Sequence, residues 1–444
     1  MNFVRQSVVR RRSLSILLLL LIVAVHGCVW LQTEQRPLPE FAVPETASFS
    51  LQSDAEPFFQ TRFASSSVDD YVHAASIAPL PDGGLMAVWF AGSREGAEDV
   101  DIRASRFDPA TQEWNPEFTL VSRETTENVL QRSIRKLGNP VIALAPGGRL
   151  WLFYVSVSVG GWAGSAINAM QSNDGGVTWS PPERLVTSPF LNISTLVRNT
   201  PVFYQDGSIG LPVYHEFLGK FAEYLHLSPD GEVLDKFRIS DGRHSLQPAI
   251  VPLSGDSALA LLRNAGKEPG KVLASFTEDR GETWSEPISV EPWNPNSSLA
   301  AISAHDAEKE ILVAMNNLRD GRYRLSLYET DPSLKNWRLR KVLDEAPDPE
   351  GRPLPPDKYR LNVARDFLAV GGNKIDDRLE EYLQYLDQRD LDRRVCREGK
   401  GCEFEYEYPN LMRSADGLFH VVYSWNNSFV KHVVFNEAWL EMRQ

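Results

Sequence analysis

An eight-residue pattern that occurs twice constrains the fold of this chain more than any other feature. Residues 172–179 read Ser-Asn-Asp-Gly-Gly-Val-Thr-Trp and residues 277–284 read Thr-Glu-Asp-Arg-Gly-Glu-Thr-Trp, so both follow Ser/Thr-x-Asp-x-Gly-x-x-Trp. In such a pattern the Asp accepts hydrogen bonds from backbone N–H groups two residues on, the Gly takes a positive φ, and the Trp folds back as an apolar plug. The pattern predicts tight hairpins with Trp179 and Trp284 in the core.

A longer unit repeats six times along the chain, and each copy has an extended run, a turn with Asp or Gly, and an apolar strand. The copies begin near His73, Asn139, Asn199, Gln247, Ser298 and Tyr408. Degenerate forms of the eight-residue pattern lie between them, at 105–114, 228–231 and 329–337. Four short antiparallel strands repeated six times predict an all-β, six-bladed β-propeller over residues 59–444. The last unit lacks an outer strand, which we expect from residues 47–51 or 60–65.

A long insertion, at about 344–403, precedes the last blade. It opens with a Pro-rich loop and becomes helical around 374–394, where Ile375, Leu379, Leu383 and Leu386 fall on one face. This helix either packs on the side of the propeller or serves as a lid or partner surface. Cys396 and Cys402 enclose five residues, which favours a disulfide over free thiols or half of a metal site.

The N-terminal residues have the features of a targeting segment. Arg5, Arg10, Arg11 and Arg12 precede an apolar run that continues to about residue 31. We therefore expect a signal anchor or transmembrane segment over 1–31, with the N-terminus in the cytoplasm and the body on the periplasmic or extracellular side of a bacterial membrane. A cleaved signal or a lipoprotein site at Cys28 are the alternatives. Residues 32–58, rich in Pro, Gln, Glu and Ser, are predicted to be a tether.

The charge balance limits the class of partner. The formal net charge is −13, from 59 acidic and 46 basic residues, which argues against a nucleic-acid partner. An anionic substrate would therefore need a local cluster of arginines.

The eight-residue patterns resemble the Asp-boxes of sialidase-like, BNR-repeat proteins, and residues 60–440 look similar to a divergent bacterial exo-α-sialidase-type group. That resemblance implies a Tyr nucleophile at the start of the last blade, where Tyr408 stands, with Glu216 as a possible partner base. It implies an acid/base Asp in the loop after the second strand, for which we choose Asp99 over Glu98 and Asp101.

One motif of that family is missing here. Its first blade begins with Phe/Tyr-Arg-Ile-Pro, whose Arg binds a sugar carboxylate, whereas this chain has Val72-His73-Ala-Ala-Ser. Carboxylate recognition would then depend on other guanidinium groups. The candidate substrate-binding residues are His73, Arg94, Arg135, Arg198, Asn199, Gln247 and Arg263, and Asn139, Asn296 and Asn316 are polar residues of similar standing.

These residues would suit one type of glycoside hydrolysis. A Tyr assisted by a carboxylate delivers negative charge to an anomeric centre beside a carboxylate, and an Asp protonates the leaving oxygen. The predicted function is therefore an exo-acting, sialidase (neuraminidase)-like glycoside hydrolase that cleaves a terminal acidic sugar from a glycan. The alternatives are a non-catalytic glycan-binding or scaffold propeller, and a glycosidase or lyase acting on another uronate-containing glycan. We expect no cofactor and no required metal, because the sequence has no Asp-x-Asp-x-Asp-Gly loop.

Overall fold

The computed structural model divides into two compact units, of which the first ends at Leu38 and the second runs from Pro39 to Gln444. The described residues are 16–24, 37–43, 56–188, 192–217, 219–242, 244–266, 269–304, 310–370, 376–390, 395–397 and 400–442. Residues 16–24 are helical and exposed, and most of the predicted anchor lies outside the described residues. Among the described residues, no helix is both long and apolar enough to cross a membrane.

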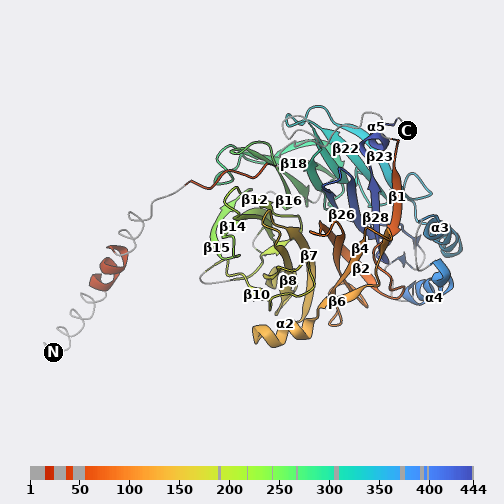
Figure 1. The fold of residues 1–444 in the computed structure, drawn as a ribbon, viewed down its shortest axis with the longest axis horizontal. Helices are drawn as coiled ribbons and strands as arrows, with labels where there is room; N and C mark the ends of the chain where they lie inside the picture. Colours follow the sequence, from red (N-terminus) through yellow and green to blue (C-terminus); the bar gives the residue numbers. More distant parts are fainter. Residues whose placement is uncertain are drawn as a thin grey trace. The chain divides into compact units, whose positions relative to one another are not determined.

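Six antiparallel sheets form the blades of a propeller in the second unit, which confirms the predicted architecture (Figure 1). Blade 1 contains β2 (Tyr71–Pro79), β3 (Leu85–Gly92), β4 (Asp101–Asp108), β5 (Glu113–Trp114) and β6 (Phe118–Val121), and blade 2 contains β7 (Lys136–Leu144), β8 (Leu150–Val157), β9 (Ser165–Ser172) and β10 (Glu183–Arg184). Blade 3 contains β11 (Leu196–Val197), β12 (Val202–Phe203), β13 (Ile209–His215), β14 (Phe221–Leu227) and β15 (Val233–Arg238), and blade 4 contains β16 (Ser245–Pro252), β17 (Ala258–Asn264), β18 (Gly270–Thr277) and β19 (Ile288–Asn294). Blade 5 contains β20 (Ala300–Ser303), β21 (Ile311–Met315), β22 (Arg324–Thr330) and β23 (Arg338–Glu345), and blade 6 contains β26 (Tyr406–Arg413), β27 (Phe419–Trp425), β28 (Phe429–Phe435) and β1 (Phe59–Phe63).

The ring closes because the N-terminal strand completes the last blade. β1 pairs antiparallel with β28 along its whole length, from Phe59 opposite Phe435 to Phe63 opposite Lys431. This pairing confirms closure by the segment near residues 60–65, whereas residues 47–51 lie outside the described residues. Part of the predicted tether also packs on the propeller, since Phe41 is fully buried and stacks on Tyr204 with ring centroids 5.0 Å apart.

The eight-residue patterns form turns between the third and fourth strands of their blades, as predicted. The Asp174 carboxylate accepts hydrogen bonds from the backbone N–H groups of Val177 and Thr178, at 3.1 and 2.9 Å. These donors lie three and four residues after the Asp, not two as expected. Trp179 donates from Nε1 to the Gly176 carbonyl at 3.2 Å, and Trp284 donates to the Gly281 carbonyl at 2.9 Å. Both tryptophans are half-buried, and Trp179 packs against the edge of a hydrophobic core cluster rather than lying fully inside it.

Two adjacent glycines of this turn provide a test of its packing. Gly175 and Gly176 both have positive φ, of 71° and 84°, so an alanine at either position is strained. A Cβ at Gly176 would also lie 3.0 Å from the Met86 sulfur of the neighbouring blade, whereas at Gly175 it would meet only Pro81 at 3.8 Å. We expect Gly176→Ala to lower the free energy of unfolding by about 1–2 kcal/mol more than Gly175→Ala, as measured by urea denaturation. Equal losses would contradict this packing.

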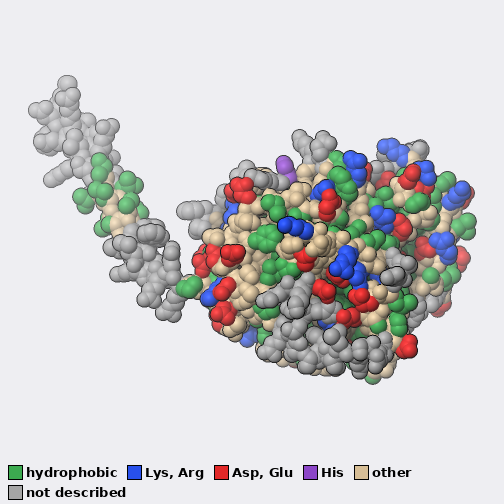
Figure 2. All heavy atoms as spheres, turned by 90° about the horizontal axis from the view of Figure 1, so that it is seen from above, with side chains coloured by type: hydrophobic (Ala, Val, Ile, Leu, Met, Phe, Trp, Pro, Cys, Tyr) green, Lys and Arg blue, Asp and Glu red, His purple; other side chains and the backbone are tan. Residues whose placement is uncertain are grey.

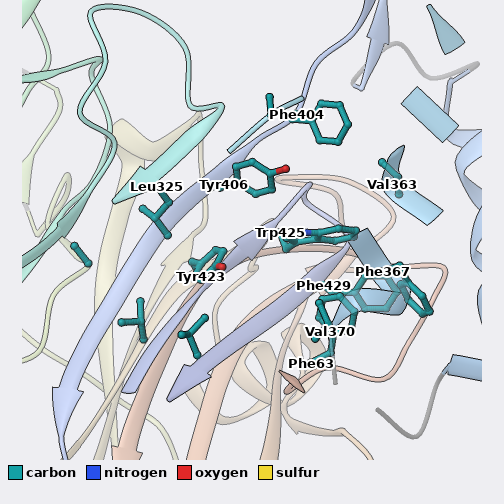
Figure 3. Close-up of a cluster of buried hydrophobic side chains, with 14 of the residues drawn as sticks. Phe63, Leu325, Val363, Phe367, Val370, Phe404, Tyr406, Tyr423, Trp425 and Phe429 are labelled. Atoms are coloured by element: carbon teal, nitrogen blue, oxygen red, sulfur yellow. The ribbon is translucent and has the colours of Figure 1, made fainter. Parts of the chain in front are cut away.

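The insertion packs against the outer side of blade 6, near β1 and β28 (Figures 1 and 3). Its elements are α3 (Pro356–Ala369), η2 (Asp376–Arg378), α4 (Leu379–Asp390), β24 (Cys396–Arg397) and β25 (Gly401–Cys402), and the remaining helices of the second unit are α2 (Arg123–Leu130), η1 (Trp162–Gly164) and α5 (Glu437–Glu441). Phe367 of α3 lies 5.5 Å from Phe63 and 5.4 Å from Phe429, measured between ring centroids. The insertion is therefore a buttress for the last blade, and the Cys396–Cys402 disulfide is confirmed.

Candidate functional site

The inner strands of the blades share an irregularity that aims side chains at the centre of the ring. The pairing of the first and second strands shifts register in blades 1, 2, 4 and 6. Each shift contains a residue with positive φ, and these are Ala74 (56°), Asn139 (45°), Gln247 (50°) and Tyr408 (55°). A bulge of this kind re-aims a side chain, and a positive φ is unusual for a residue as bulky as tyrosine. These bulges lie at the N-terminal ends of the inner strands.

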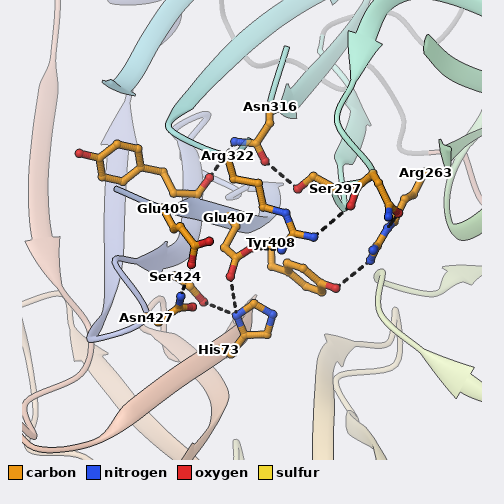
Figure 4. Close-up of polar contacts among 12 residues, drawn as sticks. His73, Arg263, Ser297, Asn316, Arg322, Glu405, Glu407, Tyr408, Ser424 and Asn427 are labelled. Atoms are coloured by element: carbon orange, nitrogen blue, oxygen red, sulfur yellow. Dashed lines mark hydrogen bonds and ion pairs between the residues drawn. The ribbon is translucent and has the colours of Figure 1, made fainter. Parts of the chain in front are cut away.

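Tyr408 is the centre of the polar cluster at this end of the ring (Figure 4). Its hydroxyl accepts a hydrogen bond from Nη1 of Arg263 at 2.8 Å, and Nε2 of Gln247 lies 3.5 Å from the same oxygen. The guanidinium carbons of Arg198, Arg263 and Arg322 lie 5.2, 5.9 and 5.5 Å from the centroid of its ring. Three guanidinium groups, from blades 3, 4 and 5, therefore surround one phenol ring at cation–π distance.

Arg198 is a structural member of this cluster. Its side chain is completely buried, and Nη2 donates to the backbone carbonyl oxygens of Tyr408 and Pro409. Burial lowers the pKa of Arg198 to about 10. Arg198 therefore holds the backbone of the Tyr408 bulge through its hydrogen bonds, and its guanidinium group packs against the Tyr408 ring. Because it is completely buried, it is not exposed to a substrate.

Glu407 precedes Tyr408 and is fixed by two partners. One carboxylate oxygen lies 3.2 Å from Nδ1 of His73, and the other forms an ion pair with Nη1 of Arg322. Burial raises the pKa of Glu407, but the charges of Arg322 and His73 outweigh it and the net shift is downward. Burial lowers the pKa of His73, and the charge of Glu407 offsets this only in part. At neutral pH we therefore take Glu407 as a carboxylate and His73 as neutral.

Asn296 joins the two arginines that face the mouth of the ring. Its side-chain oxygen accepts from Nε of Arg263 at 2.7 Å, and its backbone carbonyl accepts from Nη2 of Arg322 at 3.0 Å. Asn296 itself has a φ of 53°. It lies just before the inner strand of blade 5 and therefore sets the spacing of the two guanidinium groups.

Glu405 is a second acidic group beside this cluster. Its carboxylate accepts a hydrogen bond from Nδ2 of Asn427 at 2.6 Å. Burial and the nearby charge of Glu407 raise the pKa of Glu405 to about 7. The two carboxylates near Tyr408 thus have pKa values pushed in opposite directions by their surroundings.

Replacing Glu405 by Gln should change how stability depends on pH. The folded pKa of Glu405, about 7, exceeds its unfolded value. The contribution of Glu405 to the free energy of unfolding therefore falls as pH rises from about 4.5 to 7. Gln does not ionise, so we expect Glu405→Gln to gain about 3 kcal/mol relative to wild type between pH 5 and pH 8. Urea denaturation of both proteins at the two pH values measures this gain. A gain equal at both pH values would show that Glu405 does not titrate in this range.

The structure brings only some of the predicted site residues together. His73, Arg198, Gln247, Arg263 and Tyr408 belong to one cluster. Asn199 is linked to this cluster through Gln247, because its Nδ2 donates to the Gln247 backbone carbonyl at 2.9 Å.

The predicted loop residues lie at the same end of the ring but do not contact Tyr408 within the described part of the chain. Asp99 accepts from the backbone N–H and the hydroxyl of Ser93, so it caps its loop. Arg94 and Arg135 are exposed. Glu216 is half-buried, and its carboxylate is not among the hydrogen-bond partners of the Tyr408 hydroxyl in the described residues.

The loop that contains Asp99 has another carboxylate closer to the cluster. Glu95 accepts from Nε1 of Trp162 at 3.2 Å, and its charge raises the pKa of His73. Nζ of Lys136 lies 3.7 Å from the centroid of the Trp162 ring. Glu95, Trp162 and Lys136 therefore form a polar and aromatic rim between blades 1 and 2.

The central channel also has a cavity at its opposite end. Its volume is about 350 Å³ and its lining includes Ile77, Ile142, Val251 and Ile302, which lie in the C-terminal halves of inner strands. This lining is mostly apolar, but it also includes Asn199, Asn410 and Arg413. The Tyr408 hydroxyl and the guanidinium groups around it are not part of this lining.

Two further features bear on ligands. No group of three or more His, Cys, Asp or Glu residues that could hold a metal ion occurs among the residues that the structure describes. On the face shown in Figure 2, acidic and basic side chains are intermixed. Recognition of an anion would therefore depend on the local arginines.

Sequence reasoning missed Arg322, Glu405, Glu407 and Glu95 as site residues. Arg322 follows the second strand of its blade, as Arg94 does in blade 1, and this position was a usable signal. Glu407 precedes the predicted Tyr408 but was not distinguishable from a strand-end acid, because its partners His73 and Arg322 are far away in sequence.

Comparison with known proteins identifies the family and the fold of this chain. The profile of the BNR repeat-like domain family matches residues 83–421. Among curated proteins, none matches the chain.

Several solved structures share the fold. The Hadza microbial sialidase Hz136 superposes with a TM-score of 0.58 at 14% identity over 82% of this chain, which spans 65% of that sialidase. The intramolecular trans-sialidase from Ruminococcus gnavus, in complex with oseltamivir carboxylate, has a TM-score of 0.58 at 13% identity, covering 86% of this chain and 98% of the other. An α-L-arabinanase from Penicillium chrysogenum has a TM-score of 0.55 at 12% identity, covering 86% and 99%. At these identities the similarity establishes the fold.

Proposed function

Because this chain belongs to the BNR repeat-like domain family, we propose that it is an exo-acting glycoside hydrolase of the sialidase type, which cleaves a terminal acidic sugar from a glycan. The observation that carries this proposal is the position of Tyr408, whose hydroxyl is bonded by Arg263 and whose ring is surrounded by three guanidinium groups. Solved relatives named as sialidases share this fold, which supports the choice of an acidic sugar.

Each group would have a defined role. The Tyr408 oxygen would attack the anomeric carbon, and Arg263 would stabilise the negative charge that develops on this oxygen. The substrate carboxylate would bind the exposed edges of Arg263 and Arg322, which Asn296 holds at a fixed spacing. The loop after β3 would supply the proton donor. Glu95 suits this role better than Asp99, because Glu95 is near enough to act on His73 whereas Asp99 is engaged by Ser93.

The test is a panel of glycosides offered to the purified full-length chain. Each acidic glycoside, sialoside or uronide, is paired with the same sugar reduced from carboxylate to alcohol. We expect cleavage of at least one acidic member and none of its neutral partner. Glu95→Gln should slow substrates with poor leaving groups more than Asp99→Asn does, because a strong leaving group needs no proton. Cleavage of the neutral partner at an equal rate would contradict carboxylate recognition.

A second candidate function is a glycan-binding propeller without catalysis. The observation in its favour is that an amide, Gln247, and not a carboxylate, is the second group near the Tyr408 hydroxyl in the described residues. Binding of an acidic glycan by calorimetry, without cleavage over days, would favour this function.

A further inference from the structure

A tyrosine that acts as a nucleophile must lose its phenol proton, and the groups at the Tyr408 hydroxyl cannot take it. Nη1 of Arg263 and Nε2 of Gln247 are donors only. They can stabilise charge on the oxygen, but neither can accept its proton. The base must therefore come from elsewhere in the cluster.

His73 has the geometry of that base. Its ring packs against Tyr408 with centroids 4.2 Å apart, and its Nδ1 lies 3.2 Å from the Glu407 carboxylate (Figure 4). A carboxylate at Nδ1 requires the proton on that nitrogen, which leaves the lone pair on Nε2. In the described part of the chain, the polar contacts of the His73 ring, to Glu407 at 3.2 Å and to the Ser424 hydroxyl at 3.5 Å, are both at Nδ1. Figure 4 shows Nε2 on the side of the ring away from Glu407. Arg322 holds the other oxygen of Glu407, so the carboxylate cannot turn away.

The charges around His73 keep it neutral and able to accept a proton. It is faced by Glu407 from β26, by Arg322 from the loop after β21, by Arg198 from the segment after β11, and by Glu95 from the loop after β3. Burial is the largest influence and lowers the pKa of His73, the two carboxylates raise it, and the two arginines lower it further. The imidazole is therefore a free base at neutral pH, and Glu407 stabilises the cation that forms when it accepts a proton.

We propose that His73 is the base that takes the phenol proton of Tyr408, directly or through one water molecule, with Glu407 as its positioning residue. This inference rests on the proposed function. The Tyr408 O–H proton moves to Nε2, the oxygen bonds to the anomeric carbon, and the glycosidic C–O bond breaks while the loop carboxylic acid protonates the leaving oxygen. In the second half, water attacks the anomeric carbon and gives a proton to the loop carboxylate. The bond to Tyr408 then breaks, and the phenolate recovers its proton from His73.

The kinetic test uses an aryl glycoside of the acidic sugar that the wild-type chain cleaves. We expect His73→Gln to lower kcat/KM by roughly 10²–10⁴-fold with little change in KM, and to abolish the acidic limb of the pH profile. Glu407→Gln should also lower the rate, and it should move that limb to lower pH, since removal of a carboxylate lowers the pKa of His73. The double variant should be no slower than His73→Gln alone. His215→Gln, a half-buried histidine at the same end of the ring, is the matched control and should keep wild-type kinetics.

A second measurement tests the His73–Glu407 pair without substrate turnover. In ¹⁵N NMR spectra, His73 should be the neutral tautomer protonated at Nδ1, and Glu407→Gln should disturb that signal. A proton on Nε2 at neutral pH would overturn the inference. Retention of the acidic limb by an active His73→Gln variant would also overturn it while leaving the proposed function intact. Absence of cleavage of every acidic glycoside by the wild-type chain would overturn both.

Discussion

Tyr408→Phe should lower kcat on the cleaved glycoside by about 10³-fold or more, with KM and folding stability nearly unchanged. The substitution removes only the hydroxyl that accepts from Arg263. The ring packing on His73 and the backbone bonds from Arg198 remain. Steady-state kinetics and thermal melting of the two proteins measure these effects.

A matched control separates this effect from the loss of any tyrosine hydroxyl. Tyr328 is not part of the Tyr408 cluster. It lies in β22 of blade 5, and its hydroxyl accepts a hydrogen bond from Asn317. Tyr328→Phe should therefore keep wild-type kcat. If Tyr408→Phe retained more than about a tenth of wild-type kcat, Tyr408 would not be the nucleophile.

Arg322→Met should be the most destabilising single substitution in the cluster. The Glu407 side chain is only 4% exposed, and Arg322 neutralises it. Removing one partner of a buried pair leaves an uncompensated charge, which costs about 3–5 kcal/mol. In the variant, burial raises the pKa of Glu407 above its unfolded value, so the loss should be largest above neutral pH and shrink as pH falls. Urea denaturation at pH 5 and pH 8 measures both effects.

Arg324 provides the control for this loss. It pairs with Glu345 at 3.2 Å, with side chains 26% and 36% exposed, so the pair is well solvated. Arg324→Met should cost less than about 1 kcal/mol. Equal losses in the free energy of unfolding for Arg322→Met and Arg324→Met would show that the ion pair with Arg322 does not stabilise the buried Glu407 carboxylate.

The fold could be predicted from sequence because its signals are local. The Asp-box pattern is complete within eight residues, and each copy marks the same turn of a blade. Closure by residues near β1 followed from counting the strands of the last unit. The sequence analysis does not predict helix α3, although Tyr359, Val363 and Phe367 have helical spacing, because a Pro-rich segment that is typical of a loop leads directly into it.

The site could be predicted only in part because its contacts are not local. Tyr408 and Arg263, whose side chains are hydrogen-bonded in the structure, could be proposed from sequence because each stands at a recognisable strand end. The pairing of His73 with Glu407, however, joins residues that come together only when the ring closes. Glu216 stays a prediction as partner base, although the hydrogen-bond partners of the Tyr408 hydroxyl in the described residues are Arg263 and Gln247.

The most direct measurement of the central claim is to trap the glycosyl-enzyme. The wild-type chain is incubated with a fluorinated, activated form of the acidic sugar, which slows the second step more than the first, and the protein is examined by intact and peptide mass spectrometry. The proposed mechanism predicts one adduct, located on Tyr408 and absent from Tyr408→Phe. Turnover of this substrate with the adduct on another residue would contradict it.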